Sequence, residues 1–181
     1  MVKKLLIAFV LLTASSCSFK ASTITEIRGF ATRNNIKGLV ARIEKNDGPH
    51  KLSTNSLPTV LVINDKLEIV YKSIGHSSLF KKMLKEAINC NSVYCDLNSA
   101  YFKNKSKYSG RHINDLTLKD LDGNCHRLSS LVKKDSLAVI DFWTTWCKPC
   151  QLASKDIGEL YDEYKKTDIT FIAINVDNIE K

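Results

Sequence analysis

Ten residues of the chain, Asp141–Cys150, read DFWTTWCKPC and place two cysteines three residues apart. The apolar run from Leu137 to Trp143 predicts a buried strand, and a helical pattern follows the cysteines. Residues i and i+3 lie on one face of a helix, so the sulfurs of Cys147 and Cys150 are close enough to bond. The helix dipole favours a thiolate at the first cysteine, and the thiolate is the attacking species in disulfide exchange. The stretch therefore predicts a dithiol site.

The same stretch resembles the thioredoxin superfamily motif Asp-Phe-Trp-x-x-Trp-Cys-x-Pro-Cys, and residues 113–176 resemble the start of a membrane-associated thioredoxin of the cytochrome-maturation type. The resemblance implies an α/β fold with a central mixed sheet flanked by helices. We expect Cys147, nearer the surface, to be the nucleophile and the more buried Cys150 to resolve the mixed disulfide. A stabilising disulfide or a metal site is the alternative. One Cys-x-x-Cys supplies only two metal ligands, so we predict no metal and no cofactor.

Three neighbours of the cysteines have expected roles. The resemblance implies that Asp141 is a buried carboxylate beneath the dithiol, with a raised pKa, that accepts a proton from Cys150. The alternative is an acid near the strand end that reaches water. Trp146 is expected to form part of the substrate surface. Lys148 either stabilises the thiolate or is an ordinary solvated lysine.

A second segment, Ser56–Asp65, reads SLPTVLVIND and predicts a strand over Thr59–Ile63, followed by a second over Leu67–Lys72. A glycine and a helical pattern come next. This segment is similar to the second half of a thioredoxin fold, and Leu57-Pro58-Thr59 resembles its cis-proline signature. The resemblance implies that Pro58 is cis and lies opposite the dithiol, and that Leu57 offers its backbone to a substrate. The alternative is an ordinary proline at the start of a strand.

The two thioredoxin-like halves occur in reversed order. The sequence divides into a signal over 1–17, the second half of the fold over 22–89, a polar linker over 90–111, and the first half with the two cysteines over 112–181. Three explanations fit this order. They are a circular permutation within one chain, an exchange of halves between two chains, and a remnant of a tandem protein.

The remaining elements are predicted from local patterns. Thr23 and Glu26 have capping-box spacing. The other predicted elements are a helix over Ile24–Arg33, a strand over Leu39–Ile43, a strand and turn over Leu116–Asn124, a short helix or turn over Leu128–Val132, a helix over Cys147–Tyr164 and a strand over Ile169–Val176.

The N-terminus resembles a bacterial lipoprotein signal. Lys3 and Lys4 are followed by an apolar stretch, Leu5–Leu12, and then by small residues and Cys17. The stretch is short for a membrane-spanning helix. We expect Cys17 to be lipidated, with ordinary signal cleavage or a retained anchor as alternatives. All three place the chain outside the cytoplasm.

Composition limits the function classes. The 181 residues are 44% hydrophobic and 25% charged, as in a soluble globular protein, and carry a net charge of +8 without a nucleic-acid-binding motif. The charge indicates either a solvated cationic surface or attraction to anionic lipid headgroups. Six cysteines favour an oxidising compartment, where Cys90 and Cys95 are predicted to form a local disulfide. They could instead relay electrons, and Cys125 remains unpaired.

These observations predict a thiol-disulfide oxidoreductase of the bacterial cell envelope. It would exchange disulfides with exported protein thiols, as a reductant fed by a membrane electron donor, and the resemblance favours cytochrome c maturation. An oxidase or isomerase is the nearest alternative. A copper-binding metallochaperone and a non-catalytic remnant are alternatives from other classes.

Overall fold

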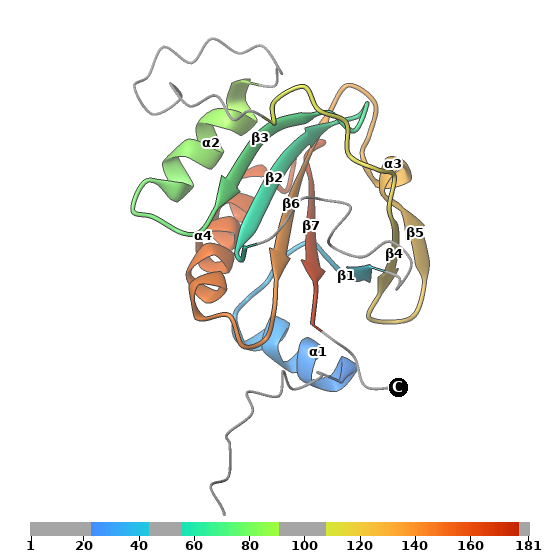
Figure 1. Cartoon of the computed structure of the whole chain (residues 1–181), viewed down its shortest axis with the longest axis vertical. Coiled ribbons are helices and arrows are strands. Elements are labelled where there is room, and N and C mark those ends of the chain that lie inside the picture. The colour runs from blue at the N-terminus through green and yellow to red at the C-terminus, as the bar shows by residue number, and fades with distance from the viewer. Residues whose placement is uncertain (1–22, 44–55, 91–107, 178–181) are drawn as a thin grey trace, which may run out of the picture.

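The computed structural model describes residues 23–43, 56–90 and 108–177, and in this part of the chain all strands join one sheet (Figure 1). The seven strands lie in the order β3-β2-β6-β7-β1-β4-β5. In chain order the elements are α1 (Ile24–Arg33), β1 (Leu39–Ile43), β2 (Thr59–Asn64), β3 (Ile69–Ile74), α2 (Phe80–Cys90), β4 (Thr117–Asp120), β5 (Cys125–Arg127), α3 (Leu128–Leu131), β6 (Leu137–Trp143), α4 (Lys148–Tyr164) and β7 (Thr170–Asn175).

Strand β6 is an inner strand of the sheet, third from the β3 edge. All seven of its residues are buried, and it pairs antiparallel with β2 and parallel with β7. Strand β1 continues the sheet beyond β7 in parallel, and β4 then runs antiparallel to β1. The sheet is therefore mixed, and strands from both halves of the sequence contribute to it.

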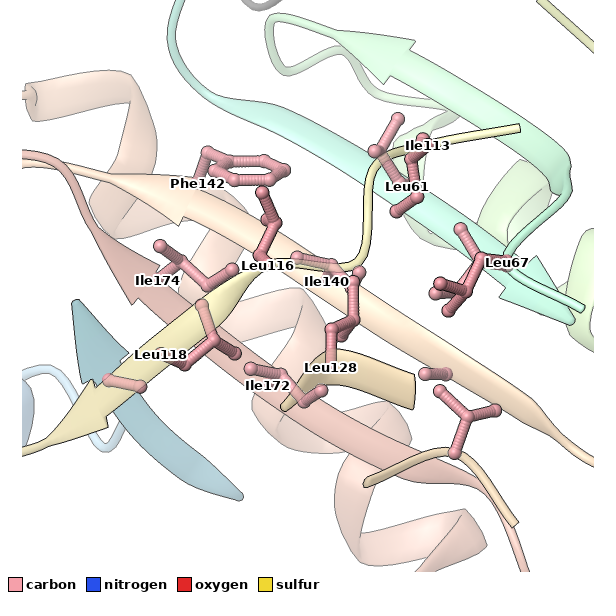
Figure 2. Close-up of a cluster of buried hydrophobic side chains, with 14 of the residues drawn as sticks. Leu61, Leu67, Ile113, Leu116, Leu118, Leu128, Ile140, Phe142, Ile172 and Ile174 are labelled. Carbon is pink, nitrogen blue, oxygen red and sulfur yellow. The ribbon is translucent and has the colours of Figure 1, made fainter. Parts of the chain in front are cut away.

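Helices α2 and α4 cover one face of the sheet (Figure 1). Polar pairs also tie the two helices to each other, among them Lys81 with Glu159 and Lys85 with Glu163. The opposite face is covered by residues from Ile113 to Val132, whose leucines meet the side chains of β2, β6 and β7 (Figure 2). Two apolar layers thus hold β6 from both sides.

Most predicted elements are confirmed. Helix α1 has the predicted bounds and the capping box between Thr23 and Glu26, and the bounds of β1 and β6 are also as predicted. The Leu57–Pro58 peptide bond is cis, as the resemblance implied. Among the described residues, no helix has the length and hydrophobicity needed to cross a membrane.

One predicted strand lies two residues further along the chain than expected. The strand predicted over Leu67–Lys72 is β3, which covers Ile69–Ile74. The turn before it is longer because the side chain of Asn64 accepts hydrogen bonds from the backbone N–H groups of Lys66 and Glu68. Leu67 adopts a positive φ of 60° within this turn. An Asx-type turn of this kind delays the start of the strand by two residues.

Two smaller differences also have local causes. Strand β5 was not predicted, because its three residues, Cys125–Arg127, show no alternation of apolar and polar side chains. The end of the predicted linker is not free of the sheet. Ile69 donates to the carbonyl of Arg111, and Gly110 donates to the carbonyl of Ile69, so this segment continues the sheet beyond β3.

Candidate active site

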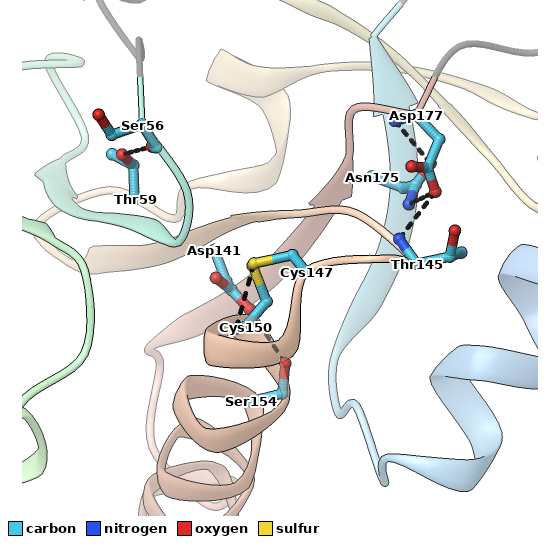
Figure 3. The surroundings of a disulfide bond; sticks show 9 residues. All are labelled: Ser56, Thr59, Asp141, Thr145, Cys147, Cys150, Ser154, Asn175 and Asp177. Atoms are coloured by element: carbon cyan, nitrogen blue, oxygen red, sulfur yellow. Dashed lines mark hydrogen bonds between the residues drawn. A yellow bond between two sulfur atoms is a disulfide. The ribbon is translucent and has the colours of Figure 1, made fainter. Parts of the chain in front are cut away.

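Cys147 and Cys150 form a disulfide at the start of α4, with their Cα atoms 5.2 Å apart (Figure 3). Cys147 is the N-cap residue, and its Sγ accepts a hydrogen bond from the backbone N–H of Cys150 at 3.2 Å. A thiolate at this position would keep that bond and lie at the positive end of the helix dipole. The sequence prediction of a dithiol at a strand-to-helix junction is confirmed.

The local sequence explains why the helix begins here. Pro149 lies in the first turn of α4, where its missing N–H has no intrahelical partner to lose. Cys150 is the first buried residue of the apolar face that continues through Ser154 and Ile157. Cys150 is fully buried and Cys147 is 4% exposed. The order of exposure agrees with prediction, but in the disulfide form Cys147 is more buried than expected.

Asp141 lies on β6 beneath the disulfide (Figure 3) and is only 3% exposed. Burial raises the pKa of this carboxyl to about 7, against the smaller opposing effect of a hydrogen bond from Ser154. That bond joins the Ser154 Oγ to Asp141 Oδ2 at 3.5 Å, whereas Asp141 Oδ1 has no hydrogen-bond partner. The alternative of an acid that reaches water is therefore wrong for Asp141. A group with a pKa near 7 can accept and release a proton at neutral pH.

The two tryptophans of the motif have different environments. Trp143 is fully buried and stacks on Phe30 of α1, with ring centroids 4.9 Å apart. Trp146 is 56% exposed although it directly precedes Cys147. Trp143 therefore packs beside the site, and Trp146 offers apolar surface to solvent. Lys148 is exposed, and its predicted contribution to the thiolate stays a prediction.

The loop before β2 contains the cis peptide bond Leu57–Pro58 and is here called the cis-proline loop; it adjoins the dithiol. Both cysteines belong to an apolar group, here called the dithiol cluster, and Leu57 packs against it. The cluster consists of Ile27, Phe30, Ala31, Trp143, Cys147, Cys150 and Ala173. Pro58 is buried next to Thr59, which is paired with Phe142 of β6. The structure thus brings the two predicted halves of the site together in one chain.

Three residues near the site were not found from the sequence. Ser154 bonds Asp141 as described, and Ile74, 55% exposed, is paired with Thr59 at the edge of the cis-proline loop. Asp177 follows β7 and accepts a hydrogen bond from the backbone N–H of Thr145, in the loop before Cys147. None has a motif of its own. Each acquires its place through a contact between segments that are distant in the sequence.

The other cysteines lie elsewhere. Cys17 and Cys95 fall outside the described residues, so their predicted roles stay predictions. Cys90 is disulfide-bonded, and its partner is not among the residues that the structure describes. Cys125 is an exposed free thiol. Within residues 23–43, 56–90 and 108–177, no three histidine, cysteine or acidic side chains are grouped as ligands for a metal ion.

Part of the chain is similar to known proteins. Residues 109–181 match the AhpC/TSA family. The chain is similar to "Thiol-disulfide oxidoreductase ResA" of Bacillus cereus, with 33% identity over 51% of this chain and 53% of the relative. It is also similar to the proteins of that name from Geobacillus kaustophilus, with 44% identity over 34% of each chain, and Geobacillus thermodenitrificans, with 39% identity over 37% of this chain and 40% of the relative. The chain spans about half the length of the first relative and less of the other two. No solved structure matches the chain.

Proposed function

We propose that this protein is a thiol-disulfide oxidoreductase that uses Cys147 and Cys150 as its redox pair. The observation that carries the proposal is the position of this disulfide, at the N-terminus of α4 and above a buried carboxyl whose pKa is about 7. A purely stabilising disulfide needs neither the helix dipole nor an acid with a neutral pKa. The name shared by the relatives supports the same reaction.

The reaction proceeds in two steps in the reducing direction. The Cys147 thiolate attacks one sulfur of a substrate disulfide, so that a mixed disulfide forms and the other substrate sulfur leaves as a thiolate. Cys150 then gives its proton to Asp141 and attacks the Cys147 sulfur. This closes the Cys147–Cys150 disulfide and releases the second substrate sulfur, which takes up a proton. The substrate gains two electrons, and the protein dithiol loses two.

The surface around the disulfide suits an extended polypeptide. Only three large apolar side chains are substantially exposed in the described part of the chain, and two of them, Trp146 and Ile74, adjoin the dithiol or the cis-proline loop. Exposed apolar side chains next to a reactive group favour binding of apolar segments. We propose that Trp146, Leu57 and Pro58 contact the substrate, with Leu57 offering its backbone.

The cellular setting is part of the proposal. A lipid anchor at Cys17 would hold the protein at the outer side of a bacterial membrane, where exported thiols are oxidised. The resemblance to cytochrome-maturation thioredoxins supports a reductant that receives electrons from a membrane donor and acts on exported protein thiols. The net charge of +8 would favour a surface of anionic lipids.

We further propose that the chain is a circularly permuted thioredoxin-like fold. Strands β2 and β3, from the first part of the chain, join β6 from the last part in one sheet. Thioredoxin-like domains normally continue from the strand that corresponds to β7 into a helix that connects the two halves of the fold. Helix α1 lies near the end of β7 (Figure 1), in the place of that connecting helix. A single chain then supplies all the parts that the resemblance requires.

Trapping of the mixed disulfide tests the function. The Cys150→Ser variant of the full chain leaves Cys147 without its resolving partner, so incubation with an oxidised peptide disulfide should give a stable adduct on Cys147, located by peptide mass spectrometry. Of the two site cysteines, the matched variant Cys147→Ser keeps only the buried Cys150, and peptide mass spectrometry should find no adduct on it. Absence of an adduct in Cys150→Ser, or its formation on Cys150 in Cys147→Ser, would refute the assigned roles.

A further inference from the structure

The loop that carries Cys147 is held from the end of β7. This loop connects β6 to α4 through Thr144, Thr145 and Trp146. The carbonyl of Trp143 accepts a hydrogen bond from the backbone N–H of Val176 at 2.9 Å. Asp177 Oδ2 accepts one from the backbone N–H of Thr145, also at 2.9 Å (Figure 3). Two consecutive residues after β7 therefore fix the loop at its start and at its middle.

Asp177 is itself held in place by Asn175. The Asn175 Nδ2 donates to Asp177 Oδ2 at 2.9 Å, and the backbone N–H of Asp177 donates to Asn175 Oδ1 at 3.2 Å. Asn175 is only 2% exposed and is in register with Trp143. The carboxylate is thus supported by a buried side chain of the sheet, and its position is tied to that of β6.

One oxygen of the Asp177 carboxylate lacks a hydrogen bond, which is unfavourable for stability. Its Oδ1 is buried and has no hydrogen-bond partner. A buried acceptor without a partner costs free energy, so such a group calls for an explanation. Asp115 offers a contrast, because both of its oxygens are bonded: Oδ1 accepts from the backbone N–H of Ser129, and Oδ2 from Ser129 Oγ and Arg127.

The consequence of the Asp177 contact falls on Cys147. Thr145 precedes Cys147 by two residues, and the backbone N–H of Cys147 donates to the carbonyl of Thr144 at 3.3 Å. The position of the loop therefore decides where the Cys147 Sγ lies relative to the N–H of Cys150, its donor at 3.2 Å. The strength of a hydrogen bond falls steeply with poorer geometry, and this bond favours the thiolate.

We propose that Asp177 is a positioning residue for the dithiol: by holding the Thr145 amide it keeps Cys147 in the N-cap geometry that favours its thiolate. The proposal rests on the proposed exchange function. Asp177 lies outside the Cys-x-x-Cys motif, and its hydrogen bonds are to Thr145 and Asn175. In this proposal it affects the thiol pKa of Cys147 through the position of the loop.

The thiol pKa of Cys147 is the direct test. It is measured in the reduced full chain from the pH dependence of alkylation at Cys147, followed by mass spectrometry. Asp177→Ala should raise it by about one unit, which lowers the thiolate fraction, and so the alkylation rate below that pKa, about tenfold. Asp177→Asn keeps an acceptor oxygen but removes the charge, and should stay within about twofold of the wild-type rate. That pair separates positioning from a charge effect.

Asp115→Ala is the matched control, because it removes a carboxylate that also accepts from a backbone N–H, away from the dithiol. It should reduce stability but leave the alkylation profile unchanged. Asp177→Glu, which keeps the charge but displaces the oxygens, should shift the profile in the same direction as alanine and serves if Asp177→Ala does not fold. An unchanged profile in a folded Asp177→Ala or Asp177→Glu variant would overturn the proposal, as would an equal shift in Asp115→Ala. Failure of the wild-type chain to exchange disulfides at all would instead reject the proposed function.

Discussion

Two aspartates of the same sheet, Asp120 and Asp141, have opposite environments. Asp120 ends β4, and both oxygens of its carboxylate are bonded by residues of the following turn and of β5. Oδ1 accepts from the backbone N–H groups of Asp122 and Asn124, and Oδ2 contacts the side chains of Asn124 and His126. Hydrogen bonds from His126, and next from Asn124, hold the pKa of Asp120 well below its usual range. Asp141, in contrast, is buried, has one weak bond, and has a pKa of about 7.

The difference indicates that Asp120 stabilises the fold, whereas Asp141 is placed to transfer a proton. Asp120 stabilises a tight turn by satisfying the N–H groups that the turn leaves open. Asp141 costs stability, because a buried carboxyl without good partners resists ionisation. Cysteines show the same division, since Cys125 is a free, exposed thiol in the hairpin of Asp120, whereas Cys147 and Cys150 form the buried pair above Asp141.

We expect the largest loss of exchange rate when Cys147 is replaced. Cys147→Ser should lower the rate of exchange with a peptide disulfide by at least about a thousandfold, because it removes the nucleophile. Cys125→Ser is the matched control and should leave the rate unchanged. Stopped-flow measurement of product thiol gives both rates. A large loss in Cys125→Ser would place the chemistry in the hairpin and reverse the comparison.

Replacing Asp141 should slow the closure of the Cys147–Cys150 disulfide, which is the second step of the proposed reaction. Asp141→Asn keeps the shape of the side chain but cannot take the proton of Cys150, so closure of the disulfide should slow by about a hundredfold. The wild-type rate of closure should rise with pH around 7, the pKa of Asp141, and this rise should be absent in the variant. Rapid quenching with an alkylating agent resolves the mixed disulfide from the product. An unchanged rate and pH profile in Asp141→Asn would rule out Asp141 as the acceptor.

The same variant should gain stability at high pH. The pKa of Asp141 is higher in the folded state than its ordinary value, so the folded state binds more protons, and stability falls as pH rises from about 4 to about 7. Above pH 7 the full cost is present. Asp141→Asn should remove this fall and be more stable at pH 8 by an amount on the order of a few kcal/mol. Urea unfolding of the disulfide form at several pH values measures the difference, and parallel curves for the two proteins would contradict it.

The exposed apolar surface gives a smaller effect. Trp146→Ala should raise KM for an apolar peptide disulfide about tenfold, because an exposed aromatic side chain at a binding surface contributes about 1–2 kcal/mol. The rate with a small disulfide such as oxidised glutathione should change little. Steady-state kinetics with both substrates tests this, and equal losses for both would assign Trp146 to the dithiol rather than to the substrate.

Replacing Asp120 should have the smallest effect. Asp120→Ala should lower the melting temperature by less than about 4 °C and leave exchange unchanged. Its folded pKa is depressed, so its contribution is present above the unfolded pKa and is lost as pH falls through the folded value. Calorimetry at neutral and acidic pH follows this loss. A change in the exchange rate would mean that the hairpin contributes to the site.

The motif-bearing parts of the site could be predicted from the sequence because their signals are local. The cysteine spacing, the apolar run of β6 and the cis-proline signature each lie within a few residues, and each is found where predicted. The contacts of Asp177 and Ile74 could not be predicted, because they depend on where β7 and β3 end relative to the dithiol loop. The shift of β3 shows the same limit, since one Asn64 side chain lengthened a turn that its composition alone left undefined.

A redox titration of the full chain against glutathione would show whether Cys147 and Cys150 act as the redox pair. The intrinsic fluorescence of Trp143 and Trp146, which flank the dithiol, reports its state. We expect a reversible two-electron transition that is absent from Cys147→Ser and unchanged in Cys125→Ser. A midpoint of about −270 mV would mark a reductant, and a midpoint of about −120 mV an oxidant. A folded chain whose tryptophan fluorescence shows no such transition, or shows one that persists in Cys147→Ser, would contradict the assignment of Cys147 and Cys150 as the redox pair.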